Sequence, residues 1–400
     1  MRLAFRKSHA VGTVQAPPSK SYAHRLLIAA ALSHGQVEGL APSQDILATI
    51  DCLNALGFGN RYDGRRVEFG RRREILSDSR IVLPCRESGS TMRFIIPLAL
   101  ALAGEGTEFL IAGSDRLLER GIAPYIRALS NVSFRNTADG ILMSGHLEAG
   151  DFNLDASTSS QYLTGLMMAL PLCEKDSCIR LENEPVSRGY LAMTEDVLGQ
   201  AGIHLEWQNE RRLFIPGGQH YSLPVTARVE GDWTNAAYLE IYNYIDGNKV
   251  SISGLRNDSA QGDRVCCMMM SRLVNEGQVD ISENIDLGPV LFALAALKGK
   301  GCISGTRRLA IKESDRVRDM ISELEAFGVE AYVSENEVEI SASGLHAPSR
   351  TLDGHNDHRL VMALVPLLTV FSGSIDGAEA VSKSFPDYFE VLTELGIGYE

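Results

Sequence analysis

Five stretches of the chain place basic and hydroxyl side chains where an apolar helical run begins. The first is Ser19–Arg25, which follows Pro17-Pro18 and leads into the apolar run Leu26–Leu32. A helix N-terminus has free N–H groups and the positive end of the helix dipole, so it attracts anions. Lys20, Ser21 and Arg25 add donors there. Taken alone, an ordinary capped surface helix explains the stretch better than an anion site does.

Two further stretches offer small and hydroxyl residues. Glu87–Arg93 precedes Phe94–Ala101, and Ser157–Gln161 precedes Tyr162–Leu172. Small residues let backbone N–H groups approach a carboxylate or phosphate closely. The first stretch lacks the glycine and lysine spacing of a nucleotide-binding loop, so ATP is not indicated. The hydroxyls of the second fit a helix cap and a phosphate ligand equally well.

The last two stretches carry charge. Lys312 and Arg316 are four residues apart, which predicts one helix face and, in isolation, a surface ion-pair ladder. In Gly354–Arg359 two histidines stand three apart, but no third ligand is evident and no metal site is expected. Anion binding by His358 and Arg359 is the better functional interpretation. Lys383, in Ser382–Tyr388, is a further candidate.

Composition limits the class of protein. The 400 residues are 44% hydrophobic and 22% charged, which is typical of a soluble globular chain of two or three domains. No apolar stretch reaches the roughly 18 residues of a membrane span, and no signal peptide is visible. Seven irregularly spaced cysteines predict a reducing cytoplasm. A net charge of −13 disfavours nucleic acid and membrane partners, so the basic helix starts predict a local cleft for small anions.

A repeated pattern suggests how these stretches are positioned. Leucine-rich helical runs end in Gly or Asn and lead into strand-like segments, six times in all. The copies end at Gly57, Asn131, Gly202, Gly277, Gly328 and Gly396. Glycine at this place suits a left-handed helix end. The pattern predicts an α/β (α+β) protein of six similar units, and composition alone places a crossing between domains in Pro216–Pro224.

Together the motifs resemble those of the 5-enolpyruvylshikimate-3-phosphate synthase (3-phosphoshikimate 1-carboxyvinyltransferase) family, in the family's order and over essentially the whole length. The motifs are Ser19–Arg25, Gly89–Arg93, Ser159-Ser160-Gln161, Lys312–Arg316, Asn356–Arg359 and Lys383–Phe389. The resemblance implies the two-domain enolpyruvyl transferase fold, with three βαβαββ units in each domain and the active site in the cleft between them. It implies a discontinuous domain I of residues 1–18 and 229–400, and a domain II of residues 19–228.

The resemblance also implies an activity and its substrates. Family members transfer the enolpyruvyl group of phosphoenolpyruvate to the 5-hydroxyl of shikimate 3-phosphate through a tetrahedral ketal, in the pathway to chorismate and the aromatic amino acids. Both substrates carry a phosphate and a carboxylate, which basic side chains suit. The residues implied for shikimate 3-phosphate are Lys20, Ser21, Arg25, Ser159, Ser160, Gln161, Ser187, Asp286 and Lys312. Those implied for phosphoenolpyruvate are Lys20, Gly89, Arg120, Gln161, Arg316, Arg359 and Lys383.

Two catalytic roles, divided among three residues, follow from the resemblance. Asp286 matches the aspartate that takes the hydroxyl proton, although alone it looks like a helix cap. Glu313 matches the glutamate that manages the methyl proton, and Lys20 is the alternative for that role. The resemblance implies no cofactor, no metal, and a monomer.

Four positions depart from the commonest family pattern. Glu87 stands where Asn is usual, Gly121 where Pro is usual, and Arg308 where some members have Asn, and the sequence after Ser187 also varies. A carboxylate at Glu87 puts the affinity for phosphoenolpyruvate and for the inhibitor glyphosate in question.

Two other functions compete with this one. The sister carboxyvinyltransferase that acts on UDP-N-acetylglucosamine carries a reactive cysteine near its matching arginine, and Leu117–Ala123 contains none. A non-catalytic anion-binding homologue would not require both Asp286 and Glu313.

Overall fold

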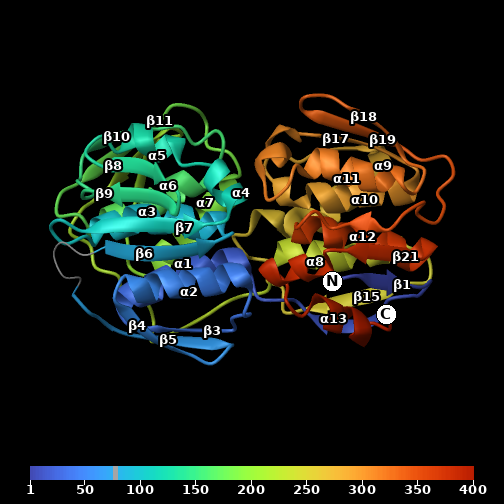
Figure 1. Cartoon of the computed structure of the whole chain (residues 1–400), viewed down its shortest axis with the longest axis horizontal. Helices are drawn as coiled ribbons and strands as arrows, with labels where there is room; N and C mark the ends of the chain where they lie inside the picture. Colours follow the sequence, from blue (N-terminus) through green and yellow to red (C-terminus); the bar gives the residue numbers. More distant parts are fainter. Residues whose placement is uncertain (75–79) are drawn as a thin grey trace. The chain divides into compact units, whose positions relative to one another are not determined.

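The chain divides into two compact units. The computed structural model describes residues 1–74 and 80–400. Unit 1 comprises Met1–Ser19 and Glu230–Glu400, and unit 2 comprises Lys20–Val229 (Figure 1). The chain therefore passes from one unit to the other after Ser19 and after Val229, each within one residue of the limits implied by the resemblance.

The crossing that composition suggested, at residues 216–224, is wrong. This segment is tied into unit 2 by polar side chains: Gln219 bonds the backbone of His204, and the Tyr221 hydroxyl donates to the Met168 carbonyl at 2.6 Å. Proline and glycine here mark a surface turn of one unit.

The described residues of unit 2 form three four-stranded sheets that share one topology. Their orders are β6-β7-β9-β8, β10-β11-β13-β12 and β14-β3-β5-β4, and in each the first pair is parallel and the others antiparallel. The strands are β3 Gln36–Glu38, β4 Phe58–Tyr62, β5 Arg66–Arg72, β6 Arg80–Arg86, β7 Glu108–Gly113, β8 Ser133–Thr137, β9 Gly140–Ser144, β10 Asp151–Leu154, β11 Ser177–Leu181, β12 Glu206–Asn209, β13 Arg212–Ile215 and β14 Thr226–Arg228. One order repeated three times is what three βαβαββ units produce.

Unit 1 repeats this topology once in full. Its four-stranded sheet has the order β16-β17-β19-β18, while the other two described sheets have the orders β1-β21-β20 and β15-β2. The strands are β1 Leu3–Phe5, β2 Val11–Gln15, β15 Lys249–Ser253, β16 Gln278–Asp280, β17 Lys300–Ser304, β18 Glu330–Val333, β19 Glu337–Ser341, β20 Leu352–Asp353 and β21 Gly373–Asp376. Two of its sheets are thus smaller than the resemblance implies.

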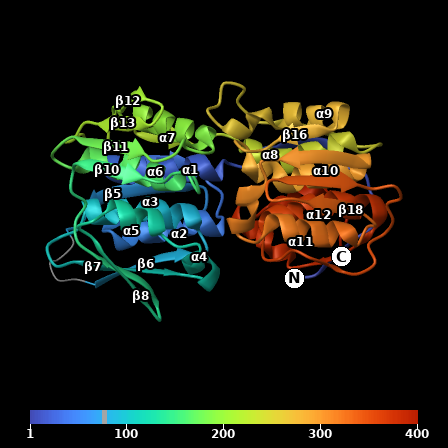
Figure 2. The ribbon, with the colours of Figure 1, turned by 90° about the horizontal axis from the view of Figure 1, so that it is seen from above.

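Five helices are buried along nearly their whole length, so the capped surface helix that Ser19–Arg25 suggested in isolation is wrong. They are α1 Lys20–Ser33, α3 Gly89–Ala101 and α6 Gln161–Ala169 in unit 2, and α10 Gly288–Lys298 and α12 His358–Phe371 in unit 1. Their sequences are apolar on nearly every side, so they lie inside each unit, between the sheets (Figure 2). The remaining α-helices are α2 Gln44–Ala55, α4 Asp115–Glu119, α5 Ala123–Ala128, α7 Arg188–Gln200, α8 Trp233–Glu240, α9 Cys266–Glu276, α11 Arg316–Glu325 and α13 Tyr388–Glu394.

Two buried helices begin earlier than their apolar runs indicate. Ser88 caps α3 by accepting from the Thr91 amide, and Asp357 caps α12 by accepting from the Arg359 amide at 2.9 Å. The polar residues from Gly89 to Arg93 are therefore in the first turns of α3, instead of in the loop before it. The free N–H groups of such a buried first turn therefore lie close to the polar side chains of the same turn.

Five of the six expected helix ends have the left-handed glycine. Gly277, for example, ends α9 with φ 77° and donates to the Leu273 carbonyl at 2.9 Å. Asn131 is the exception, because its φ is not positive; its side-chain amide donates to the His146 carbonyl at 2.7 Å. None of the helices in the described part of the chain combines the length and apolar character that a membrane crossing needs.

Candidate active site

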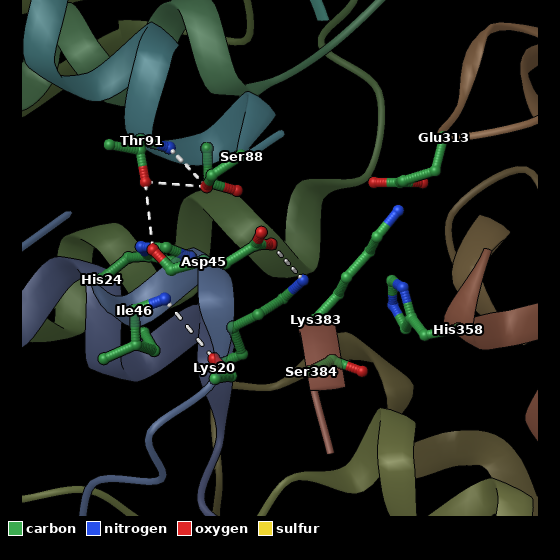
Figure 3. A network of polar contacts seen from close by, with 12 residues as sticks. Lys20, His24, Asp45, Ile46, Ser88, Thr91, Glu313, His358, Lys383 and Ser384 are labelled. Carbon is green, nitrogen blue, oxygen red and sulfur yellow. Dashed lines mark hydrogen bonds and ion pairs between the residues drawn. The ribbon is translucent and has the colours of Figure 1, made fainter. Parts of the chain in front are cut away.

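In unit 2 the start of α1 presents Lys20 to a carboxylate. The Lys20 amine lies 2.7 Å from Asp45 on α2, and both side chains are largely buried (Figure 3). Behind this pair runs a buried chain of hydrogen bonds in which His24 meets Thr49, Thr49 meets Thr91 at 2.7 Å, and Thr91 bonds the cap residue Ser88. The chain links α1, α2 and α3, so it fixes the place of Lys20.

Arg25 is held by neutral acceptors. Its guanidinium donates to the Thr194 hydroxyl at 2.8 Å and to the carbonyls of Ser21 and Tyr190, and it lies over the Phe94 ring. Its exposed fraction is 2%. Burial lowers the pKa of Arg25 to about 10, because no carboxylate among the described residues compensates for the lost water.

Two arginines surround Gly89 in unit 2. A side-chain carbon on Gly89 would lie 2.7 Å from the guanidinium of Arg93 and 3.0 Å from that of Arg120. Arg93 also donates to the Gln161 side chain at 2.7 Å, and Gln161 donates to Ser90 at 2.9 Å. The buried Nε of Arg93 finds no acceptor among the described residues. A bound anion would supply that acceptor.

The backbone at Gly121 explains one departure from the family pattern. Gly121 has φ 66°, which proline cannot adopt, and it follows Arg120 directly. This chain therefore turns after α4 in a way that the usual proline forbids.

The serines of this unit lie at helix starts without all acting as caps. Ser160 is the residue before α6 and makes no side-chain cap bond, whereas Ser159 accepts from the Gln161 amide at 3.3 Å. Ser187 is buried in the left-handed conformation, φ 56°, directly before α7. The cap that the hydroxyl cluster suggested is therefore supplied by Ser159.

In unit 1 a single buried arginine organises the site. Arg316 is 1% exposed, so the surface ion-pair ladder expected from its spacing is wrong. Its guanidinium bonds Asp286 at 2.8 Å, Glu313 at 2.6 Å and Asp357 at 2.8 Å. Burial lowers the pKa of Arg316 more than any other single cause, but the three carboxylates together outweigh it and raise the pKa well above its usual value.

Lys312 reaches the same cluster from outside the helix. The expected single helix face is also wrong, because Lys312 is in extended conformation and α11 begins only at Arg316, after its cap Asp315. The Lys312 amine lies 3.1 Å from the Asp286 carboxylate. Burial lowers the pKa of Lys312, and Asp286 opposes that shift.

Asp286 is not the cap that its sequence suggested. It lies in a short 3-10 turn, Ile285–Leu287, and the residue before α10 is Leu287. Its carboxylate is committed to Lys312 and Arg316 instead. Asp286 and Glu313 therefore share one buried cation, which holds the two carboxylates close together.

Two further basic residues of unit 1 are Arg359, at the start of α12, and Lys383. Arg359 is buried, donates to Asn235 at 3.2 Å and lies over the Tyr238 ring. Its Nε has no acceptor among the described residues, as for Arg93 in unit 2. Lys383 donates to the Asn356 carbonyl at 2.5 Å, and in Figure 3 its amine points toward Glu313.

Sequence reasoning gave no role to three residues that the structure makes central. Asp357 is fully buried, bonds Arg316 through both oxygens and caps α12. Arg93 holds Gln161, and Asp45 holds Lys20. Asp357 and Arg93 lie inside motifs that were recognised, but only their distant partners distinguish them from their neighbours.

Comparison with known proteins decides the family. The family model described as EPSP synthase (3-phosphoshikimate 1-carboxyvinyltransferase) matches residues 6–392. The chain belongs to this family. The chain is 34% identical to the 3-phosphoshikimate 1-carboxyvinyltransferase of Clostridium kluyveri, over 96% of this chain and 95% of that protein. It is 33% identical to the protein of the same name from Methanoculleus marisnigri, over 96% of each.

Solved structures show the same fold. EPSP synthase from Acinetobacter baumannii matches with a TM-score of 0.80 and 19% identity, over 100% of this chain and 99% of that one. The enolpyruvyl transferase NikO from Streptomyces tendae matches with a TM-score of 0.76 and 15% identity, over 100% of this chain and 98% of that one. The predicted EPSP synthase resemblance and enolpyruvyl transferase fold are both confirmed.

Proposed function

We propose that this protein transfers the enolpyruvyl group of phosphoenolpyruvate to the 5-hydroxyl of shikimate 3-phosphate and releases phosphate. The observation that carries the assignment beyond family membership is the pair of carboxylates on Arg316. Asp286 and Glu313 lie on one buried guanidinium, where a protein that only bound anions would have no use for two negative charges.

We assign polar residues of each unit to the two substrates. Arg25 and Lys20 offer cations whose neighbours are already fixed, which lowers the entropic cost of holding a phosphate. The assigned shikimate 3-phosphate residues are Lys20, Ser21, Arg25, Ser159, Ser160, Gln161, Ser187, Asp286 and Lys312. The assigned phosphoenolpyruvate residues are Lys20, Gly89, Arg120, Gln161, Arg316, Arg359 and Lys383.

The chemistry follows from the carboxylates. The 5-hydroxyl oxygen attacks C2 of phosphoenolpyruvate while its proton passes to Asp286 and a proton from an acid reaches C3. In the second step the C2–O bond to phosphate breaks and the new methyl group loses a proton, so the products are the enolpyruvyl ether and phosphate. We assign the C3 proton to Glu313, with Lys20 as the second candidate. Both roles need ionisable groups near the substrates.

We also propose that the enzyme works as a monomer in the cytoplasm, without a cofactor or metal, on small anionic substrates alone. The net charge of −13 supports the absence of nucleic acid and anionic membrane partners. Sedimentation velocity at micromolar protein tests the monomer, because a dimer would sediment as a species of twice the mass of 43.6 kDa.

The decisive experiment is a phosphate-release assay on the purified protein. We expect release from phosphoenolpyruvate only when shikimate 3-phosphate is present. The assay must be repeated with UDP-N-acetylglucosamine as acceptor, since phosphate release with that acceptor alone would show the sister activity. Binding of both substrates without release would show an anion-binding homologue.

A further inference from the structure

Two consecutive residues before α12 are held in an unfavourable backbone conformation. His355 has φ 49° and Asn356 has φ 50°, both in the left-handed region, and neither is glycine. Such residues persist only where their surroundings hold them. They lie in the motif that ends in Arg359, so the groups that hold this turn also decide where the basic residue lies.

The His355 side chain anchors the turn to α11. Its Nε2 lies 2.8 Å from Glu323, its Nδ1 lies 3.9 Å from Asp319, and its amide donates to Asp353 at 2.7 Å. The Glu323 side chain is only 2% exposed and also accepts from Arg350 at 2.6 Å. His355 is therefore anchored to a buried carboxylate, Glu323, which Arg350 holds from its other side.

The charge around His355 favours its protonated form. The three carboxylates of Glu323, Asp319 and Asp353 act on it. Two arginines compete for them: Arg350 pairs with Glu323, and Arg318 pairs with the same Asp319 Oδ1 that lies nearest the ring. The hydrogen bond to Glu323 raises the pKa of His355 above its usual value, and the two other carboxylates add to this, against the effect of burial. A protonated ring can donate to Glu323 and attract Asp319 at once.

The other side of the turn holds basic residues of the active site. The Asn356 carbonyl accepts from Lys383 at 2.5 Å. Asp357, the next residue, bonds Arg316 at 2.8 Å and caps the helix at the Arg359 amide. One short segment thus connects the His355 anchor to all three of these cations.

We propose that protonated His355 is a positioning residue, which keeps the turn in the conformation where Lys383 and Arg359 bind phosphoenolpyruvate. Affinity for phosphoenolpyruvate then falls when His355 loses its proton. This rests on the proposed function, since it concerns the same substrate. It adds a pH-dependent control that acts through a residue with no substrate contact of its own.

The first test compares wild-type protein with His355→Gln between pH 6 and 8.5. The Gln amide can reach the place of Nε2 and still donate to Glu323, but it cannot carry the charge. We expect KM for phosphoenolpyruvate in His355→Gln to be raised roughly fivefold or more below the pKa of His355, with kcat nearly unchanged, as for a coupling between two sites. The wild-type KM should approach the variant's as the pH rises. Ionisation of the substrate affects both proteins equally, so the ratio of the two values isolates His355.

Two further variants separate positioning from mere stability. His355→Arg keeps a positive charge beside Glu323 and Asp319 and should restore a low KM that no longer changes over this pH range, although arginine tolerates the left-handed backbone less well. His220→Gln is the matched control, because His220 is an exposed histidine of unit 2. It should leave the pH profile unchanged. A purely structural role would lower the unfolding free energy while the KM ratio stayed constant with pH, and that result would overturn the inference.

A wild-type measurement keeps the inference testable if the variants do not fold. Competitive acetylation of Lys383, read by mass spectrometry, should increase relative to that of the exposed Lys7 as His355 titrates, with the titration itself followed by NMR of the ring proton. This readout needs no turnover. A protein that releases no phosphate but shows the coupled labelling would contradict the proposed function alone. If the protein is active but neither the acetylation of Lys383 nor the KM ratio changes as His355 titrates, only the further inference is contradicted.

Discussion

The basic residues of the two units are held in different ways. In unit 2 the buried Arg25 is surrounded by a hydroxyl and two carbonyls, and Arg93 by an amide oxygen. In unit 1 the buried Arg316 contacts three carboxylates. The pKa of Arg25 is accordingly lowered to about 10 by burial, while that of Arg316 is raised by its partners.

The difference indicates a division of tasks. A cation held by neutral acceptors keeps its charge available, so a phosphate can bind it without displacing an ion pair. A cation shared by three carboxylates would divide its charge between them and a substrate, but it also fixes those carboxylates in place. Unit 2 thus holds Arg25 among neutral groups, whereas unit 1 holds the two carboxylates of the proposed proton transfers on Arg316. Lys20 with Asp45 is the exception in unit 2, and Arg359, which donates to the neutral Asn235 side chain, is the exception in unit 1.

The largest effect should come from Asp286→Asn. This change keeps the shape but removes the proposed base, so we expect kcat to fall by about 10²–10⁴-fold. Calorimetry should still detect shikimate 3-phosphate binding to the folded variant. The matched control is Asp45→Asn, the same change in the lysine–carboxylate pair of unit 2, where kcat should fall less than roughly tenfold. Equal losses of kcat in the two variants would contradict the proposed difference between the two units.

The next largest effect concerns stability. Asp357→Asn removes one charge from the buried Arg316 cluster, and we expect the free energy of unfolding to fall by about 3–5 kcal/mol because a buried pair is broken. Urea unfolding followed by the fluorescence of Trp233, in a Trp207→Phe background, reports on unit 1. An unchanged midpoint would mean that Asp286 and Glu313 satisfy Arg316 on their own.

A smaller loss is expected from Thr194→Val in unit 2. Valine has the shape of threonine but leaves the Arg25 Nε without its acceptor, which should cost about 1–3 kcal/mol. Trp207 fluorescence, in a Trp233→Phe background, follows this unit. If Thr194→Val destabilised its unit as much as Asp357→Asn does, the neutral and ionic environments would be equivalent and the comparison would fail.

The smallest effect is an opposite response of the two units to pH. Burial holds the pKa of His24 well below its usual value, so as the pH falls below about 6.5 the unfolded chain gains a proton that folded unit 2 does not, and stability drops. The pKa of His355 is raised, so as the pH rises above about 6.5 the unfolded chain loses a proton that folded unit 1 keeps, and stability drops. Each slope is at most about 1.4 kcal/mol per pH unit.

The two single-tryptophan proteins can measure these slopes by urea unfolding from pH 5.5 to 8. His24→Asn, whose amide can still bond Thr49, should flatten the acid slope of unit 2, and His355→Gln should flatten the alkaline slope of unit 1. Slopes that survived these changes would have to come from other titrating groups.

The sequence determined the local features of this protein. Five glycines predicted left-handed helix ends, and the motifs predicted the family and the fold. These signals lie within a few residues of one another, so they can be read along the chain. The same local reasoning placed Lys312 and Arg316 on one helix face and failed, because an extended residue and a new cap intervene.

The partners of the charged groups were decided by the tertiary structure. Arg316 meets Asp286 from 30 residues away and Asp357 from 41 residues away, and Arg25 meets Thr194 from 169 residues away. These distances span whole strand and helix crossovers, so no spacing along the chain records them. Whether a buried arginine is paired with carboxylates or with neutral oxygens depends on those crossovers. This pairing is what distinguishes Arg316 of unit 1 from Arg25 of unit 2.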